Sequence, residues 1–234
     1  LEKQPDHRYA TADELAGDLQ RFAEGRPVLA LRTGPAGRVV KWARRKPVIA
    51  GLAALATLAV RWRDMVARLQ DSDFAHGDLQ HGNVMVDQAG QLRLVDLDGV
   101  WIPQLAGQAP PTEYGHANYQ HPVRRVWDRR LDTFSALVIY LSLVALSNDP
   151  ALWMALYNSK NLLFCKADFF PPFQTEAWKQ LAALHDPQVD ELVRRLQECC
   201  AVDWVPENAL EMTLAPPSAR TPQPQIPAEL RWWE

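Results

Sequence analysis

Residues 76–99, HGDLQHGNVMVDQAGQLRLVDLDG, hold two short apolar runs separated by a polar turn and flanked by acidic side chains. Val84–Val86 and Leu92–Val95 have the length and composition of strands, and the residues between them include a glycine. This pattern predicts a β-hairpin. In a hairpin, the loop that enters the first strand and the loop that leaves the second meet at one end of the strand pair.

Those two loops carry side chains with oxygen ligands. Asp78 and Asn83 precede the first strand, and Asp96 and Asp98 follow the second. Phosphoryl transfer needs one carboxylate to orient or deprotonate an attacking hydroxyl, while a carboxamide and a second carboxylate hold Mg²⁺ on the phosphates. Asp78, Asn83 and Asp96 match these roles, whereas Asp98 either adds a carboxylate to the metal site or only caps the turn into Gly99.

Four motifs in order resemble the protein-kinase-like superfamily. HGDLQHGN at 76–83 stands where a protein kinase has H-R-D-L-K-x-x-N, and DLDG at 96–99 stands where it has D-F-G. GHANYQHP at 115–122 is similar to the end of an activation segment, and DTFS at 132–135 is similar to the start of the large central helix.

The resemblance implies the C-terminal lobe of a serine/threonine-protein kinase, with ATP and Mg²⁺ as cofactors and a hydroxyl of a protein substrate as acceptor. It makes Asp78 the catalytic base, Asn83 and Asp96 the Mg²⁺ ligands, and Met85 the floor of the adenine site. It also implies that Asp132 braces the backbone of the catalytic loop.

Three positions depart from the family pattern. Gly77 replaces an arginine that reads a phosphorylated activation loop, which argues against activation by phosphorylation. Gln80 takes the catalytic-loop position of a lysine that neutralises the transferred phosphate, so a lower rate is expected. Val123 replaces a glutamate that pairs with an arginine in the family, and the matching stretch 199–212 contains no arginine. The absence of both partners is physically consistent, because one buried charge left alone is costly.

The sequence contains no G-x-G-x-x-G. Lys41, in RVVK, lies too close to Asp78 for the elements of an ATP-binding upper lobe to fit between them. We therefore expect the upper lobe to be missing from this chain. The alternative to an active phosphotransferase is an inactive kinase-derived fragment, or pseudokinase, that binds partners.

The N-terminal residues 1–37 carry a second resemblance, to the last helices of a bacterial serine/threonine kinase domain. Thr11 and Glu14 form a capping box that predicts a helix ending before Gly25. The matching signature consists of Pro5, Arg8, Tyr9 and Thr11.

Residues 38–60 combine a basic run with an uncharged, almost wholly apolar run, 48–60. The apolar run is shorter than the ~20 residues of a membrane span, and this length favours a buried helix. The preceding cations favour a second interpretation, a cut-short anchor that gives weak association with a membrane.

Residues 61–214 are expected to form the kinase-like C-terminal lobe. Residues 133–146 are apolar on all sides and predict a central helix. Further helices are predicted at 176–184 and at 187–200, the latter with Asp186 as N-cap and Pro187 in its first turn. The Pro-rich tail, 215–234, is expected to stay unfolded. The predicted fold class is mainly α with a small β-hairpin.

The composition limits the class of protein to which the chain can belong. The chain has 234 residues, 47% of them hydrophobic, and a net charge of −3, which excludes wholesale disorder and a generally basic nucleic-acid-binding protein. Its 3 cysteines cannot form a disulfide framework or a spaced zinc site, which predicts a reducing compartment and hence a cytoplasmic location.

Overall fold

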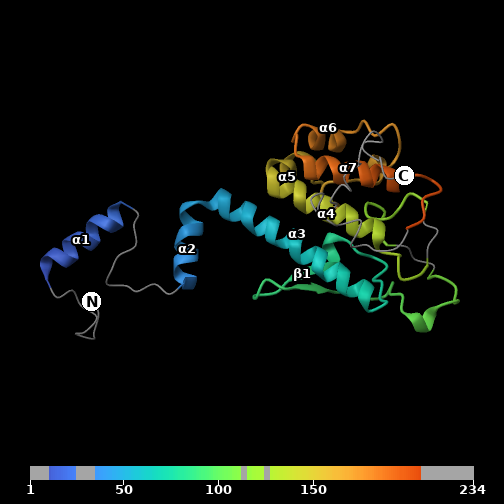
Figure 1. Cartoon of the computed structure of the whole chain (residues 1–234), viewed down its shortest axis with the longest axis horizontal. Coiled ribbons are helices and arrows are strands. Elements are labelled where there is room, and N and C mark those ends of the chain that lie inside the picture. The colour runs from blue at the N-terminus through green and yellow to red at the C-terminus, as the bar shows by residue number, and fades with distance from the viewer. Residues whose placement is uncertain (1–10, 25–34, 112–114, 124–126, 207–234) are drawn as a thin grey trace, which may run out of the picture. The chain divides into compact units, whose positions relative to one another are not determined.

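The computed structural model describes residues 11–24, 35–111, 115–123 and 127–206. The described chain is mainly helical with one small two-stranded antiparallel sheet, as predicted (Figure 1). It divides into two compact units, Leu1–Ala50 and Gly51–Glu234. The tail at 215–234 and most of the N-terminal kinase signature lie outside the described residues.

The first unit contains helices α1 (Ala12–Ala23) and α2 (Pro35–Arg45). The hydroxyl of Thr11 accepts a hydrogen bond from the Glu14 amide at 3.2 Å, which confirms the predicted helix start. Helix α2 was not predicted, because its residues combine a proline, a glycine and a run of cations. Its start at a proline is consistent with the fixed φ of that residue, which suits the first helical turn.

Helix α3 (Pro47–Asp71) contains the apolar run 48–60 and continues beyond it to Asp71. Within 48–60 only Ala59 is buried, so the buried-helix interpretation of this run is wrong. In this run Leu55 and Ala59 reach the core. In the following turns Trp62 and Val66 are buried, and the Trp62 indole donates to the Ala136 carbonyl at 3.0 Å. None of the described helices is both long and apolar enough to cross a membrane.

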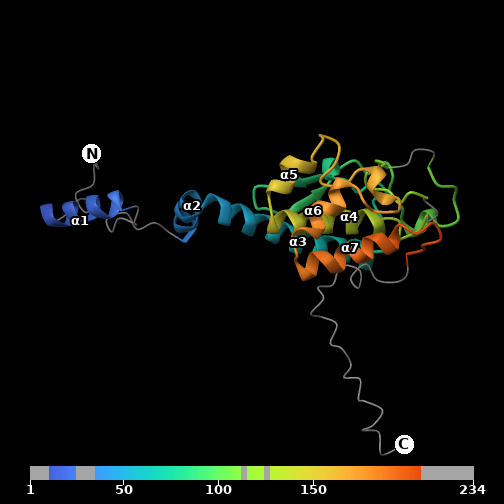
Figure 2. The ribbon, with the colours of Figure 1, turned by 90° about the horizontal axis from the view of Figure 1, so that it is seen from above.

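Helix α4 (Thr133–Asn148) is the centre of the second unit and is buried on nearly all sides, as predicted. It packs against α7 (Pro187–Cys199) and against the short helix α5 (Ala151–Leu156), which was not predicted. Helix α6 (Glu176–Ala182) packs on α5 and α7, the two helices that pack on α4, while α3 supplies Trp62 to α4 (Figures 1 and 2).

Helix α7 begins where the sequence predicts. The Asp186 carboxylate accepts from the amides of Gln188 and Val189 at 3.0 and 2.9 Å, and Pro187 occupies the first turn. This cap satisfies two backbone donors that a helix start otherwise leaves without partners.

The predicted hairpin is also present. Strands β1 (Val84–Val86) and β2 (Leu92–Leu94) pair antiparallel, with Val84 opposite Leu94 and Met85 opposite Arg93. One face of the pair packs on the core through Val84, Leu92 and Leu94. The other face carries Met85, which is 58% exposed. The hairpin therefore leads the chain into and out of one region next to the core.

Candidate functional site

The hairpin brings two of the predicted site segments together. The Val95 amide donates to the Asn83 carbonyl at 3.0 Å, so Asp96 follows directly on a residue bonded to Asn83. The imidazole of His76 reaches the same strand end, with Nε2 3.0 Å from the Val95 carbonyl oxygen. These contacts confirm that the loops on the two sides of the hairpin meet at one end.

Asp78 is held in one orientation by three donors. Its Oδ2 accepts from the side-chain amides of Gln80 at 2.7 Å and Asn83 at 3.1 Å. Its Oδ1 accepts from the backbone amide of His116 at 2.8 Å. An ionised carboxylate has about four lone-pair sites. Three are used here, which leaves about one for a further donor such as a substrate hydroxyl.

Asn83 is buried and presents a single free polar atom. Its Nδ2 donates both to the Asp78 carbonyl at 3.0 Å and to the Asp78 carboxylate, so both N–H groups are used. No group among the described residues donates to its Oδ1. Because an amide oxygen is a hard ligand, Oδ1 is the atom of Asn83 that is available to a cation.

Asp96 and Asp98 lie on the exposed turn after β2. Asp96 has φ 64°, a left-handed conformation that is uncommon outside glycine and is enriched at functional sites. Neither carboxylate accepts a hydrogen bond from the described part of the protein. No hydrogen bond in that part joins Asp98 to Asn83 or Asp96, so the structure places Asp98 on the same turn without bonding it to the site.

The described residues contain no group of three His, Cys, Asp or Glu side chains that could hold a metal ion. Mg²⁺ in nucleotide sites is usually held by one or two carboxylates together with substrate phosphates. The free amide oxygen of Asn83 and the free carboxylate of Asp96 fit that kind of site.

The loop before β1, residues 76–83, is braced from the core by Asp132, at the start of α4. Its carboxylate accepts from the amides of His76 at 2.5 Å and Gly77 at 2.8 Å, and the residue is 5% exposed. His76 Nδ1 accepts from the Asp78 amide at 3.3 Å, which places its proton on Nε2, facing Val95. His76 is fully buried, so it braces the loop and does not face a substrate.

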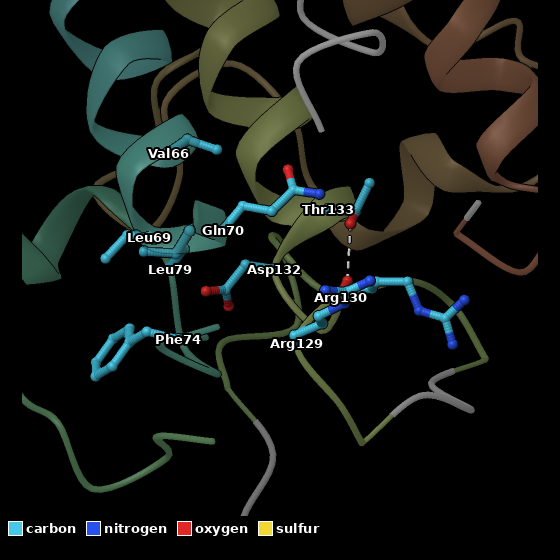
Figure 3. Close-up of a pocket in the computed structure, with 9 residues that line it drawn as sticks. All are labelled: Val66, Leu69, Gln70, Phe74, Leu79, Arg129, Arg130, Asp132 and Thr133. Atoms are coloured by element: carbon cyan, nitrogen blue, oxygen red, sulfur yellow. Dashed lines mark hydrogen bonds between the residues drawn. The ribbon is translucent and has the colours of Figure 1, made fainter. Parts of the chain in front are cut away.

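A pocket lies on the core side of this loop (Figure 3). Asp132 is part of its wall, and Thr133 beside it donates to the Arg130 carbonyl at 2.8 Å. Asp78, Asn83 and Asp96 do not line it, so it is separate from the candidate site. The remaining lining residues are Val66, Leu69, Gln70, Phe74, Leu79 and Arg129.

The segment Gly115–Gln120 is bonded to the loop at two further points that sequence reasoning missed. The Gln120 side-chain amide donates to the Gly77 carbonyl at 3.3 Å, and the Tyr119 hydroxyl lies 2.6 Å from His81 Nδ1. Burial raises the pKa of Tyr119, so its hydroxyl keeps the proton and donates it. Burial, and then the nearby His116, lower the pKa of His81, which favours the neutral, accepting imidazole.

His121 links this segment to the end of α7. Its ring stacks on Trp204 with centroids 5.4 Å apart, and its Nε2 lies 3.2 Å from the Ala201 carbonyl oxygen. Val123, where the family has a glutamate, is partly exposed. An aromatic and hydrogen-bonded contact therefore connects His121 to the residues that directly follow α7. The motif GHANYQHP locates the segment, but no pattern in it predicts these partners.

No family model matches the chain, and no curated protein matches it.

Proposed function

We propose that this chain is the catalytic lobe of a protein-kinase-like phosphotransferase that uses ATP and Mg²⁺ to phosphorylate Ser or Thr hydroxyls of proteins. One observation carries the proposal. A carboxylate fixed by three N–H donors, Asp78, lies against an amide with a free oxygen, Asn83, and the hairpin brings Asp96 to the same place. The brace from Asp132 to the loop backbone, which the family resemblance implies, supports it further.

Each residue has a role that its contacts allow. Asp78 orients the acceptor hydroxyl through its remaining lone pair and accepts the proton as the oxygen attacks. The Asn83 amide oxygen and the Asp96 carboxylate hold Mg²⁺. Met85 offers an exposed apolar surface on the outer face of β1 to the adenine ring. Bound Mg·ATP supplies the phosphoryl group and the positive charge that stabilises it.

Gln80 supports the base and does not supply charge. Its amide donates to Asp78 Oδ2 at 2.7 Å, so it fixes the rotamer of that carboxylate. A neutral amide cannot neutralise the transferred phosphate as a lysine does. We therefore expect slow transfer, and Gln80→Lys is expected to raise the rate only if the new ammonium group faces the phosphate.

The second candidate is a kinase-derived binding module, or pseudokinase. The specific observation that favours it is the engagement of Asp78, since three of about four acceptor sites are already occupied by protein donors. The sequence also contains no Gly-rich loop, which favours the binding module as well. In this candidate the ordered segment Gly115–Gln120 serves as a docking surface for a partner protein.

Phosphate transfer decides between the two candidates. The full chain is incubated with radiolabelled ATP, Mg²⁺ and casein, as wild type, Asp78→Asn and the surface control Asp64→Asn. Loss of a general base lowers the rate ~10²–10⁴-fold, so label transfer should fall by at least about 100-fold in Asp78→Asn only. Transfer that is equal in Asp78→Asn and wild type would refute the assignment of the base.

Thermal unfolding with Mg·ATP tests binding without turnover. Ligand at 100 times its Kd stabilises the folded state by about 2.7 kcal/mol, which is a shift of several degrees for a domain of this size. We expect the shift in wild type and in Asp64→Asn, and its loss in Asp96→Ala. No shift in wild type, together with no label transfer, supports the binding module.

We also propose a cytoplasmic location. Cys165, Cys199 and Cys200 are all free thiols in the described structure. Burial raises the pKa of Cys199 and of Cys200 to about 12, so both stay protonated and unreactive. Reduced, unpaired cysteines are typical of proteins kept in a reducing compartment.

A further inference from the structure

The positive charge of this chain is concentrated in one stretch. Between Glu24 and Asp64 the sequence has nine lysine and arginine residues and no acid, although the whole chain carries a net charge of −3. The remainder of the protein is therefore strongly acidic. Blocks of like charge often act as interaction segments for a partner of opposite charge.

Within the first unit, this stretch also exposes apolar side chains. Val39 on α2 is 62% exposed, Trp42 is 43% exposed, and Val48 in the first turn of α3 is 67% exposed. Val40 and Ile49 are exposed as well. These residues lie beside Arg44, Arg45 and Lys46, which are also exposed.

Helix α2 separates the two kinds of side chain. Val39, Trp42 and Ala43 have the spacing i, i+3, i+4 and share one face, whereas Arg44 and Arg45 fall outside that face. A helix with one apolar face, one basic face and a tryptophan lies in the plane of a membrane surface, with its apolar face at the boundary between headgroups and acyl chains.

We propose that α2 and the first turn of α3, residues 35–49, bind the surface of a bilayer that contains anionic lipids. The cations pair with lipid phosphates and carboxylates, and Val39, Trp42 and Val48 enter the headgroup boundary. Charge complementarity selects an anionic partner. The exposed valines and tryptophan select a lipid surface over nucleic acid, whose interfaces are polar as well as basic. The contact is peripheral, and it does not depend on the proposed phosphotransferase activity.

Co-sedimentation of the full chain with vesicles tests this inference. The vesicles contain phosphatidylcholine alone or with about 30% phosphatidylserine, a mixture that carries the negative surface charge of a cytoplasmic leaflet. The charge variant is R44Q/R45Q/K46Q. Its matched control is K160Q/K166Q/K179Q, which removes three exposed lysines from the second unit and changes the net charge equally. The apolar variant is V39S/W42S, and far-UV circular dichroism checks that helix content is retained.

Wild type should bind the anionic vesicles and not pure phosphatidylcholine, and the binding should weaken with salt. Each cation near such a surface contributes ~1 kcal/mol, so R44Q/R45Q/K46Q should bind roughly 100-fold more weakly, while the lysine control stays within about 2-fold. V39S/W42S should lose roughly 10-fold.

Three results would overturn the inference. The first is wild-type binding that is absent or independent of lipid charge. The second is an equal loss of vesicle binding in the charge variant R44Q/R45Q/K46Q and in its matched control K160Q/K166Q/K179Q. The third is unchanged vesicle binding of V39S/W42S together with tight binding of wild type to duplex DNA, which would assign residues 35–49 to nucleic acid.

Discussion

Gly77 is the residue of the candidate site at which we expect an added methyl group to lower the free energy of unfolding most. It has φ 81°, its amide donates to Asp132, and its carbonyl accepts from Gln120. A Cβ built on Gly77 would collide with the carbonyl oxygen of Gly99. Gly107 has nearly the same backbone angle, φ 80°, but nothing lies within 4 Å of its Cβ position.

The pair Gly77→Ala and Gly107→Ala therefore separates backbone strain from steric collision. A left-handed conformation costs an L-residue about 1–2 kcal/mol. Replacing glycine recovers about 0.4–1 kcal/mol by restricting the unfolded chain, so Gly107→Ala should cost about 1 kcal/mol. Gly77→Ala carries the same cost and must also displace backbone at Gly99, and such overpacking costs about 1–3 kcal/mol. We expect Gly77→Ala to be the more destabilised variant by about 1–3 kcal/mol.

Equilibrium urea unfolding, followed by both tryptophan fluorescence and circular dichroism, measures the two free energies of unfolding. Equal m-values in the two variants and wild type would show that the comparison concerns stability alone. If Gly77→Ala and Gly107→Ala differ by less than about 0.5 kcal/mol, the close approach of the loop to Gly99 is not a constraint on this fold.

Two further substitutions test the brace and the charge network. Asp132→Asn keeps one acceptor but turns an N–H toward a buried amide, so it should lower the free energy of unfolding by about 1–3 kcal/mol. The exposed control Asp64→Asn should change this free energy by less than about 0.5 kcal/mol. Equal urea midpoints for the two variants would contradict the brace. Hydrogen bonding from Arg194 lowers the pKa of Glu191 from 4.5 to about 2, so Glu191 stabilises the fold fully above about pH 4.5 and loses this effect as the pH falls toward 2. Glu191→Gln should therefore lower Tm at pH 7, by an amount equivalent to up to about 1 kcal/mol. Thermal scans should show that the difference in Tm between wild type and variant vanishes near pH 2. A difference in Tm that is independent of pH would exclude a charge effect.

Local signals in the sequence were sufficient for several elements. Thr11 with Glu14, and Asp186 with Pro187, predicted the starts of α1 and α7, because caps act within one turn of the helix that they begin. The hairpin followed from strand composition and a glycine turn, and its strands end within one residue of the prediction. For α6 the predicted end, 184, was two residues late, which is the usual uncertainty of a fraying helix end.

Other features depend on which surfaces meet. The run 48–60 is apolar enough to be buried, but within it Leu55 and Ala59 pack against the core, and of the two only Ala59 is fully buried, so most of the run is exposed. Whether a segment is buried depends on the surface that packs against it as well as on its own residues. No local sequence pattern specifies that surface. Helix α2 was missed for the opposite reason, since a basic segment that contains proline and glycine resembles a loop until its backbone hydrogen bonds are seen.

The same division applies to the candidate site. The sequence by itself determined that Asp78, Asn83 and Asp96 flank one hairpin, and a hairpin joins its two ends whatever surrounds it. Only the tertiary structure decided how Asp78 is held, through the His116 amide and the brace from Asp132. These contacts join residues 38 to 56 positions apart in the chain. Packing of the central helix sets such distances, and residue types alone do not.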